Sequence, residues 1–278
     1  MTSEYTIKPT GKLSINWKEL WRYRELFYFF TWRDVKVKYK QTLLGFLWAI
    51  LQPLAMMIVF VLFFAKGLSI PTDNIPAPIF YFVGLMFWNL FSSGLSAAAN
   101  SMVSNAEVIK KIYFPRLIVP FSGVLVALFD FFMTLIPFIF LLVYYQISTD
   151  FVFSVHLFWQ LPLALLITIF TTIGLGCMIA AWNVKYRDFR YIVPFMIQFL
   201  LFITPVIYPV AMFDNTPIAK YILSLNPMTG VMLLSRNSFS GDELQLTLVS
   251  ISLLSTALFF IIGLFTFRKM EAYFADIA

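Results

Sequence analysis

The residue types that usually carry out catalysis are few in this chain and lie far apart. His156 is the only histidine and Cys177 the only cysteine. A zinc site needs three or four Cys, His or carboxylate ligands, whereas these two residues lie at opposite ends of one apolar stretch. The sequence has no Gly-x-x-x-x-Gly-Lys-Ser/Thr loop to hold nucleotide phosphates. It therefore predicts a chain that is not an enzyme, holds no metal and binds no cofactor of its own.

Asp130 is the one acidic residue placed well within an apolar stretch. A carboxylate inside a membrane is costly and usually marks a functional site. Two interpretations stay open: a direct role in transport, or a structural hydrogen bond, gate or dimer contact. Its expected partner is Thr134, a backbone carbonyl or a group on another helix. An ion-coupled carrier usually has several such groups, so a single carboxylate disfavours that class.

The composition predicts an integral membrane protein. The chain has 278 residues, of which 60% are hydrophobic and only 12% are charged, and 33 of them are Phe. Soluble domains carry about 25% charged residues. We therefore interpret residues 1–278 as a single all-α, polytopic membrane domain, with an interfacial region at 1–42, a six-span bundle at 43–267 and a tail at 268–278.

Six apolar stretches are each long enough for a helix to cross the hydrocarbon core, which takes about 20 residues. They are Leu43–Ala65, Ile79–Ala99, Leu117–Tyr145, Leu157–Trp182, Tyr191–Val210 and Leu244–Phe267. Within the fourth stretch, Gly174 and Gly176 indicate close helix packing. Assigned to the two sides of these spans, seventeen of the twenty Lys and Arg residues fall on one side. The positive-inside rule then predicts that both termini are cytoplasmic.

The residues after the fifth stretch, Ala211–Glu243, are too apolar for an exposed loop. Pro217 and Pro227 interrupt this region, and Pro194, Pro205 and Pro209 lie in the fifth stretch before it. We expect short re-entrant helices here, because broken backbone at membrane depth must pack on protein or line a cavity. The alternative is an interfacial hairpin that lies on the membrane surface.

The segment before the first stretch combines aromatic and basic residues, which is typical of a helix lying among lipid headgroups. Asn16 with Glu19 fits the capping-box pattern at its start. Simple anchoring by positive charge is the alternative interpretation. The residues assigned to this interfacial helix are Trp17, Trp21, Arg22 and Arg24.

Two loops on the basic side are candidate docking elements. Ser104 with Glu107 fits a capping box, Ile109 and Tyr113 share a helical face, and Pro115 is expected to end the helix. A short amphipathic helix of this kind can lie in a groove on a soluble partner. A mere turn between spans is the alternative. The second loop, around Tyr186, is short and charged.

Aromatic and polar residues within the spans are candidates for a channel or gate. Aromatic rings suit the apolar faces of sugars, although most of these side chains are expected to face lipid or the core. The candidates are Phe87, Trp88, Phe91, Asp130, Gln198 and Tyr208.

Taken in order, several short motifs resemble the membrane subunits of ABC-2 polysaccharide exporters, which export O-antigen, capsule or teichoic acid. The matching segments are Arg33–Trp48, Leu51-Gln52-Pro53, Lys110–Arg116, Tyr186-Arg187-Asp188, Thr204–Tyr208 and Asn226-Pro227. Each motif alone is weak. Their order, together with six spans and cytoplasmic termini, makes the resemblance fairly specific, and it covers nearly the whole chain.

The resemblance implies a homodimer joined to two separate ABC-type ATPase subunits, which would bind ATP and Mg. It implies a multi-pass protein of the bacterial inner membrane that moves an undecaprenyl-linked glycan outward, with lipid and no nucleic acid among its partners. An ABC-2 exporter of a drug, lipid or haem is the alternative, and a membrane glycosyl or acyl transferase is disfavoured. The residues that the resemblance assigns to ATPase coupling are Ser104, Glu107, Ile109, Lys110, Lys111, Tyr113, Arg116, Tyr186, Arg187 and Asp188.

Overall fold

The computed structural model describes residues 17–40, 42, 44–149, 154–186, 188–241 and 243–271, and these residues form helices without strands. The predicted all-α, polytopic membrane fold is confirmed. In chain order the elements are α1 (Trp17–Arg22), α2 (Arg24–Lys40), α3 (Leu47–Phe60), the π-helix η1 (Val61–Gly67), α4 (Ala77–Ser104), α5 (Ala106–Lys111), α6 (Ile118–Ser148), α7 (Leu157–Lys185), α8 (Phe189–Ile203), η2 (Val210–Phe213), α9 (Pro217–Ser224), α10 (Pro227–Ser240) and α11 (Leu246–Glu271).

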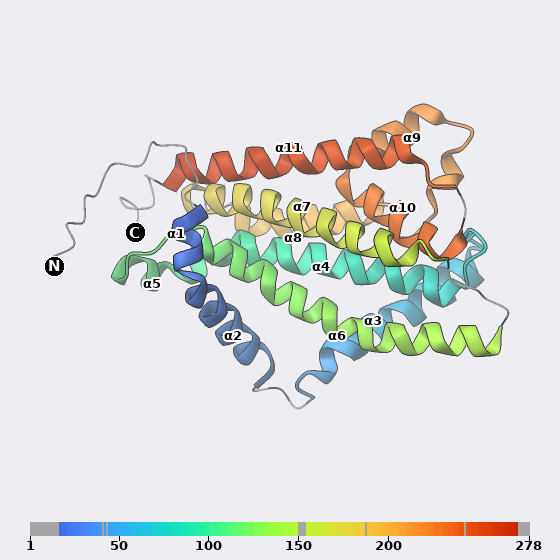
Figure 1. Cartoon of the computed structure of the whole chain (residues 1–278), viewed down its shortest axis with the longest axis horizontal. Coiled ribbons are helices and arrows are strands. Elements are labelled where there is room, and N and C mark those ends of the chain that lie inside the picture. Colours follow the sequence, from blue (N-terminus) through green and yellow to red (C-terminus); the bar gives the residue numbers. More distant parts are fainter. Residues whose placement is uncertain are drawn as a thin grey trace.

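The helices form an elongated bundle with two distinct ends. Figure 1 shows α1, α5 and the C-terminal end of α11 at one end, and α9 and α10 at the other. Arg116, just after α5, donates to the backbone oxygen of Glu271 at 2.6 Å, which fixes the end of α11 beside the α5 loop. The first and last described helices therefore share one end of the bundle.

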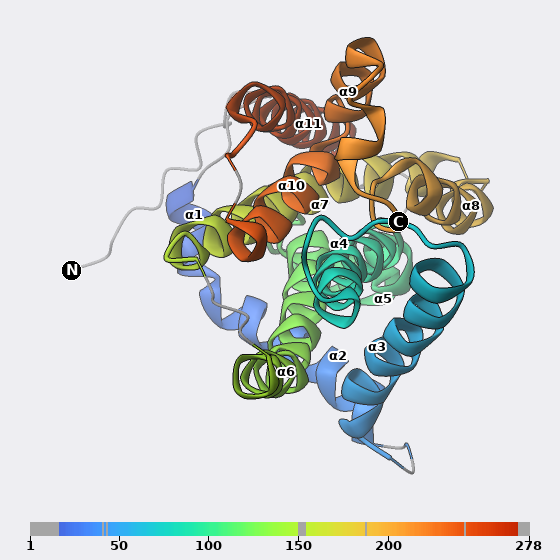
Figure 2. The ribbon, with the colours of Figure 1, turned by 90° about the vertical axis from the view of Figure 1, so that its right-hand side faces the viewer.

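Helix α4 is the centre of the bundle. Viewed along the long axis, it lies between α3, α6 and α7 (Figure 2). Most of its side chains are buried, whereas α3, α6 and α11 expose large apolar faces. Exposed apolar faces on long helices are what a lipid solvent requires. Among the described residues, five helical segments are long and apolar enough to span a membrane: α3 with η1, α4, α6, α7 and α11.

The predicted fifth span is shorter than expected. Tyr191–Val210 does not form one helix, because α8 ends at Ile203 after 15 residues. At 1.5 Å per residue that is about 22 Å, short of the hydrocarbon core of about 30 Å. Thr204 takes an extended conformation, as expected for a residue that precedes a proline.

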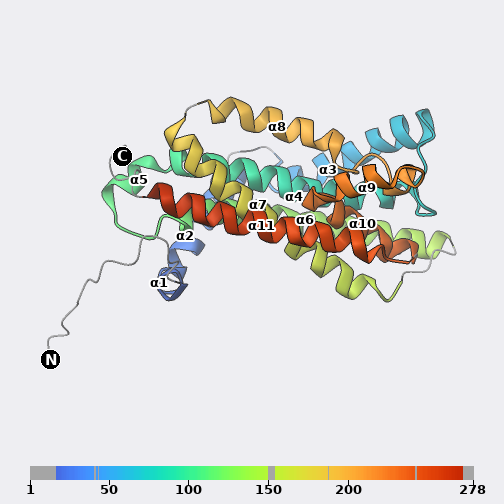
Figure 3. The same ribbon diagram turned by 90° about the horizontal axis from the view of Figure 1, so that it is seen from above.

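The predicted short helices after α8 are present and are packed on protein. Helix α10 is almost wholly buried and contacts α4, α7 and α11. Figure 3 shows α9 and α10 at the end of the bundle opposite α5. The alternative of a hairpin lying on the surface is wrong for this helix, because its buried side chains belong to the main core.

The segment before the first span is helical, with two different faces. Leu20, Phe30 and Tyr39 are buried against the bundle, whereas Trp21 is 72% exposed. The apolar and aromatic side chains of this segment are therefore divided between a face that packs on the bundle and an exposed face. Asn16 lies outside the described residues, as does the side chain of Trp17.

Small residues bring α7 and α11 into backbone contact. A Cβ on Gly263 would overlap the carbonyl oxygen of Gly174, and a Cβ on Gly174 would lie 2.6 Å from the Phe259 oxygen. A Cβ on Gly176 would lie 2.6 Å from Cβ of Ala98 in α4. The close packing predicted from Gly174 and Gly176 is confirmed.

We expect Gly263→Ala to destabilise the protein, because the methyl group meets backbone atoms that cannot rotate away. The free energy of unfolding should fall by about 2 kcal/mol or more, seen as a lower Tm in detergent. The control is Ile261→Ala on the same helix, since that side chain is 65% exposed. A wild-type Tm for Gly263→Ala would contradict the close packing.

Candidate functional site

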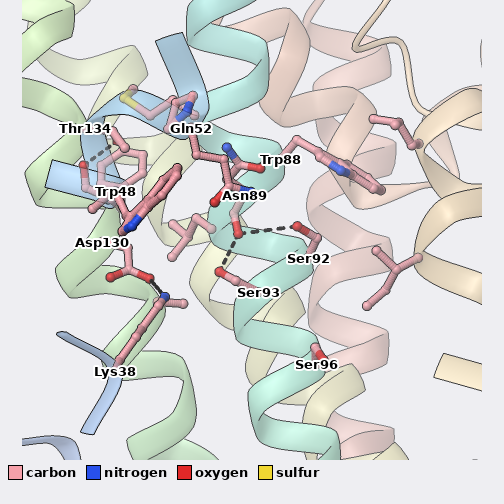
Figure 4. A pocket seen from close by; sticks show the side chains of 18 of the residues that line it. Lys38, Trp48, Gln52, Trp88, Asn89, Ser92, Ser93, Ser96, Asp130 and Thr134 are labelled. Atoms are coloured by element: carbon pink, nitrogen blue, oxygen red, sulfur yellow. Dashed lines mark hydrogen bonds and ion pairs between the residues drawn. The ribbon is translucent and has the colours of Figure 1, made fainter. Parts of the chain in front are cut away.

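A cavity of about 490 Å³ opens on one side of α4. Helices α3 and α8 flank it, α6 forms another wall, and the end of α2 closes its base. Figure 4 shows side chains from α2, α3, α4 and α6 gathered together, among them Trp48, Gln52 and Asp130, whereas the Trp88 ring points away from this group. The lining residues used below are Lys38, Tyr39, Trp48, Gln52, Trp88, Asn89, Ser92, Ser93, Asp130, Thr134 and Gln198.

The cavity combines aromatic rings with side-chain amides that make no hydrogen bond within the described part of the chain. Trp48 lies beside Asp130 and below Gln52 in Figure 4. Within the described part of the chain, the side-chain amides of Gln52, Asn89 and Gln198 have no hydrogen-bond partner. Ser93 instead donates to the backbone oxygen of Asn89 at 2.5 Å. The amides can therefore donate to and accept from a ligand, while the rings offer flat apolar surfaces.

Asp130 is held by two residues of α2. Its Oδ2 lies 2.5 Å from the ammonium of Lys38, and its Oδ1 accepts from the hydroxyl of Tyr39. Of the partners expected from the sequence, a group on another helix is correct and Thr134 is wrong, because Thr134 donates to the backbone oxygen of Phe131. Burial raises the pKa of Tyr39, and its bond to the Asp130 carboxylate raises that pKa further. Tyr39 therefore stays protonated as a donor at neutral pH.

The structure separates the six channel candidates into two groups. Trp88, Asp130 and Gln198 line the cavity. Phe87 and Phe91 do not line it, although they are buried in the same core as Trp88. Tyr208 lies beyond α8 and donates to the backbone oxygen of Ile203 at 2.8 Å. The cavity wall also includes Trp48 and two polar residues within spans, Gln52 and Asn89.

The predicted docking loop contains a helix with a different start and end. Ser104 is the last residue of α4, Asn105 separates the two helices, and α5 makes no side-chain cap bond. The predicted capping box is therefore wrong. Helix α5 ends at Lys111, before Pro115, so Tyr113 lies outside it and is 84% exposed.

The remaining docking candidates lie mostly at the surface of the same end. Glu107, Lys110 and Lys111 are exposed, and Ile109 is half-buried. The loop between α7 and α8 lies at the α5 end (Figure 3), with Tyr186 exposed there. Asp188 is exposed too, and Arg187 lies outside the described residues. Arg22 and Arg24 are exposed on α1 and α2.

Arg236 is the structural residue that sequence reasoning missed, because it was counted as a loop charge. It is buried within α10, and its guanidinium donates to the backbone oxygens of Pro205 and Val206, each at 2.6 Å, and of Tyr208 at 3.1 Å. Its Cζ lies 3.6 Å from the centre of the Phe80 ring. The signal in the sequence was its place within an apolar run that starts at Met228.

Two of the short motifs noted above meet at this same place. Asn226 caps α10 by accepting from the backbone nitrogen of Met228 at 3.0 Å, with Pro227 at the first helical position. Its amide nitrogen donates to the Thr204 hydroxyl at 2.8 Å. The Asn226-Pro227 motif therefore starts α10 and also fastens it to the segment that ends α8.

An all-helical membrane bundle with an open cavity of rings and amides has the architecture of a transport protein. No cluster of three or more potential metal ligands occurs among the residues that the structure describes. Residues 25–240 match the ABC-2 type transporter family, and the chain belongs to that family.

The chain is similar to three curated transport proteins along most of its length. It is 34% identical over 218 residues to the O-antigen export system permease protein RfbA of Myxococcus xanthus, covering 77% of this chain and 80% of that protein. It is 27% identical to an RfbA of Klebsiella pneumoniae, with 88% and 92% covered. It is 24% identical to the polysialic acid transport protein KpsM of Escherichia coli, with 84% and 87% covered.

Replacing Arg236 should destabilise the broken backbone after α8. Arg236→Met leaves three backbone oxygens without their donor, and each buried unsatisfied group costs about 1–3 kcal/mol. Arg236→Lys should be intermediate, since one ammonium cannot reproduce the planar fork of donors. Both effects are read as a lower Tm in detergent. The control is Arg190→Met at an exposed site on α8; equal Tm values for all variants would contradict the structural role.

Proposed function

We propose that this chain is the permease subunit of an ATP-driven exporter that moves a lipid-linked polysaccharide outward across the cytoplasmic membrane of a bacterium. The observation that carries the proposal is the cavity beside α4, in a chain of the ABC-2 transporter family. The names of the similar proteins, which concern O-antigen export and polysialic acid transport, favour polysaccharide over other cargo.

The cavity chemistry suits a sugar chain. A pyranose ring has apolar C–H faces that stack on aromatic rings and hydroxyl groups that pair with amides. Trp48 and Trp88 supply rings, and Gln52, Asn89 and Gln198 supply amides. With Lys38 paired to Asp130, the wall also carries little net charge, so a neutral polymer could slide without being held at one site.

The open side of the cavity favours a homodimer. Helices α3 and α8 flank its mouth, and their apolar side chains are largely exposed in a single chain. A second copy related by a two-fold axis would place the same wall opposite and enclose the path. Membrane lipid would cover the remaining exposed faces of the bundle, which carry side chains such as Phe140.

The energy source is proposed to be a separate ABC-type ATPase, two copies per dimer, which binds ATP and Mg. The sequence has no loop for nucleotide phosphates, and α5 leaves Glu107 and its basic end exposed for a partner. The Lys and Arg excess at this end favours a cytoplasmic location for it, together with both termini. The undecaprenyl carrier is proposed from the family resemblance.

The proposal is tested by complementation and co-purification in the native cells. Without the chain, lipid-linked polysaccharide should accumulate on the cytoplasmic side of the membrane. The wild-type chain should restore export and purify with an ABC-type ATPase at a one-to-one ratio. Glu107→Lys or Ile109→Asp should lose the ATPase and export while the chain stays in the membrane, because the first reverses an exposed charge on the docking helix and the second places a charge at its half-buried apolar residue.

The matched control is Glu243→Lys, the same charge change at an exposed site near the start of α11, which should restore export. Absence of any ABC-type ATPase in the wild-type preparation, in detergent that preserves other membrane complexes, would contradict the proposal. Normal polysaccharide export together with retention of another compound would indicate an ABC-2 exporter of different cargo.

A further inference from the structure

Helix α2 is joined to the rest of the bundle by polar contacts at two sites along its length. At Arg33 it contacts the junction between α4 and α5, and at Lys38 and Tyr39 it contacts α6. Lys38 follows Arg33 by five positions, which is about 7.5 Å along a helix. The exposed docking helix and the cavity wall are therefore connected through one short rigid element.

The first contact is made at the start of α5. Nη2 of Arg33 donates to Oδ1 of Asn105 at 2.7 Å, and Asn105 is the single residue between α4 and α5. The amide nitrogen of Asn105 donates to the Ser101 oxygen at 2.9 Å, so its side chain is fixed on α4 as well. Because Arg33 takes the oxygen that could have capped α5, the start of α5 is coupled to α2.

The second contact is made on the cavity wall. Lys38 and Tyr39 both bind Asp130 of α6, and Asp130 lines the cavity. The centre of the Tyr39 ring also lies 4.7 Å from the centre of the Phe46 ring, in the turn before α3. A shift of α2 along its axis would thus act on α6 and on the turn before α3, which both border the cavity.

Both polar contacts of α2 border a second cavity. This cavity, of about 750 Å³, lies between α2 and helices α4, α5 and α6, and Arg33, Lys38, Asn105 and Glu107 are among its lining residues. Close packing would resist displacement in this region. Arg33 and Lys38 make the polar contacts at the border of this cavity, while Phe30, Val35 and Tyr39 pack α2 on the bundle.

We propose that α2 transmits movement of the docking helix α5 to the cavity wall, and that Lys38 and Asp130 are positioning residues whose ion pair makes α6 follow α2. The inference rests on the proposed function, in which an ATPase docks at α5. A bound ligand or partner shifts a conformational equilibrium only through contacts that differ between the two states. The Lys38–Asp130 pair and the Arg33–Asn105 bond are contacts whose geometry depends on the position of α2.

The experiment is a charge exchange in the complete complex of this chain with its ATPase, reconstituted in vesicles. The readout is polysaccharide transported per ATP hydrolysed. Lys38→Glu and Asp130→Lys should each lower this ratio about tenfold, within the usual range of coupling between sites. The double variant should recover most of the wild-type ratio, because the pair is restored with its charges reversed. A wild-type ratio in either single variant, or no recovery in the double variant, would overturn the inference.

Lys36→Glu is the matched control, because it makes the same charge change at an exposed site on α2, where Lys36 lies over the Trp32 ring. It should keep the wild-type ratio. If the single charge variants do not assemble, Tyr39→Phe removes only the hydroxyl that binds Asp130 and should still lower the ratio; no change there would also overturn the inference.

An error in the proposed function and an error in the role of α2 give different experimental results. If the wild-type chain recruits no ATPase or transports no polysaccharide, the proposed function itself is wrong. If the wild-type complex transports normally and the charge-exchange variants behave like it, only the role of α2 is wrong.

Discussion

Backbone that leaves a helix inside a membrane must find hydrogen-bond partners within the protein, because lipid offers none. In this chain that constraint falls on the segment after α8, and the guanidinium of Arg236 meets it by binding three backbone oxygens there. Asn226 fastens the same segment to the start of α10. Helix α10 can then pack against α4, α7 and α11. One wall of the cavity, α8, thereby gets a fixed position beside α4 although it is too short to cross the membrane alone.

The wall of the cavity formed by α6 is held by polar contacts with α2, while the far side of the bundle is held by close packing. Glycine contacts hold α7 against α11, and α4 against α7, so the back of the bundle is closely packed. The front, where α3, α6 and α8 surround the cavity, is open, and Asp130 there is held by α2 instead of by its own helix. The exposed α5 lies at the end of the bundle where a soluble partner could reach α2.

Much of the fold could be predicted from residues that are close together in the sequence. Long apolar stretches predicted the main helices, and the prolines around Thr204 predicted the broken region, because both signals act within one segment. What the sequence did not reveal depends on contacts between segments far apart. The sequence suggested that Arg236 is a loop charge, because its backbone partners lie in a distant segment after α8. It also suggested that Ser104 caps the next helix, although Ser104 is the last residue of α4. Trp88 and Phe91 are both aromatic residues of α4, yet only Trp88 lines the cavity, a distinction set by neighbouring helices.

The central claim, that polysaccharide passes along the cavity beside α4, is tested most directly by photo-crosslinking in cells. A photoreactive amino acid at Gln52, on the cavity wall, should capture the labelled polysaccharide while the ATPase is active, and should capture little when the ATPase is inactivated. The same amino acid at Phe140, which is 72% exposed on α6 and does not line the cavity, should capture lipid only. Equal capture of polysaccharide at both positions, or capture at Phe140 alone, would contradict the account.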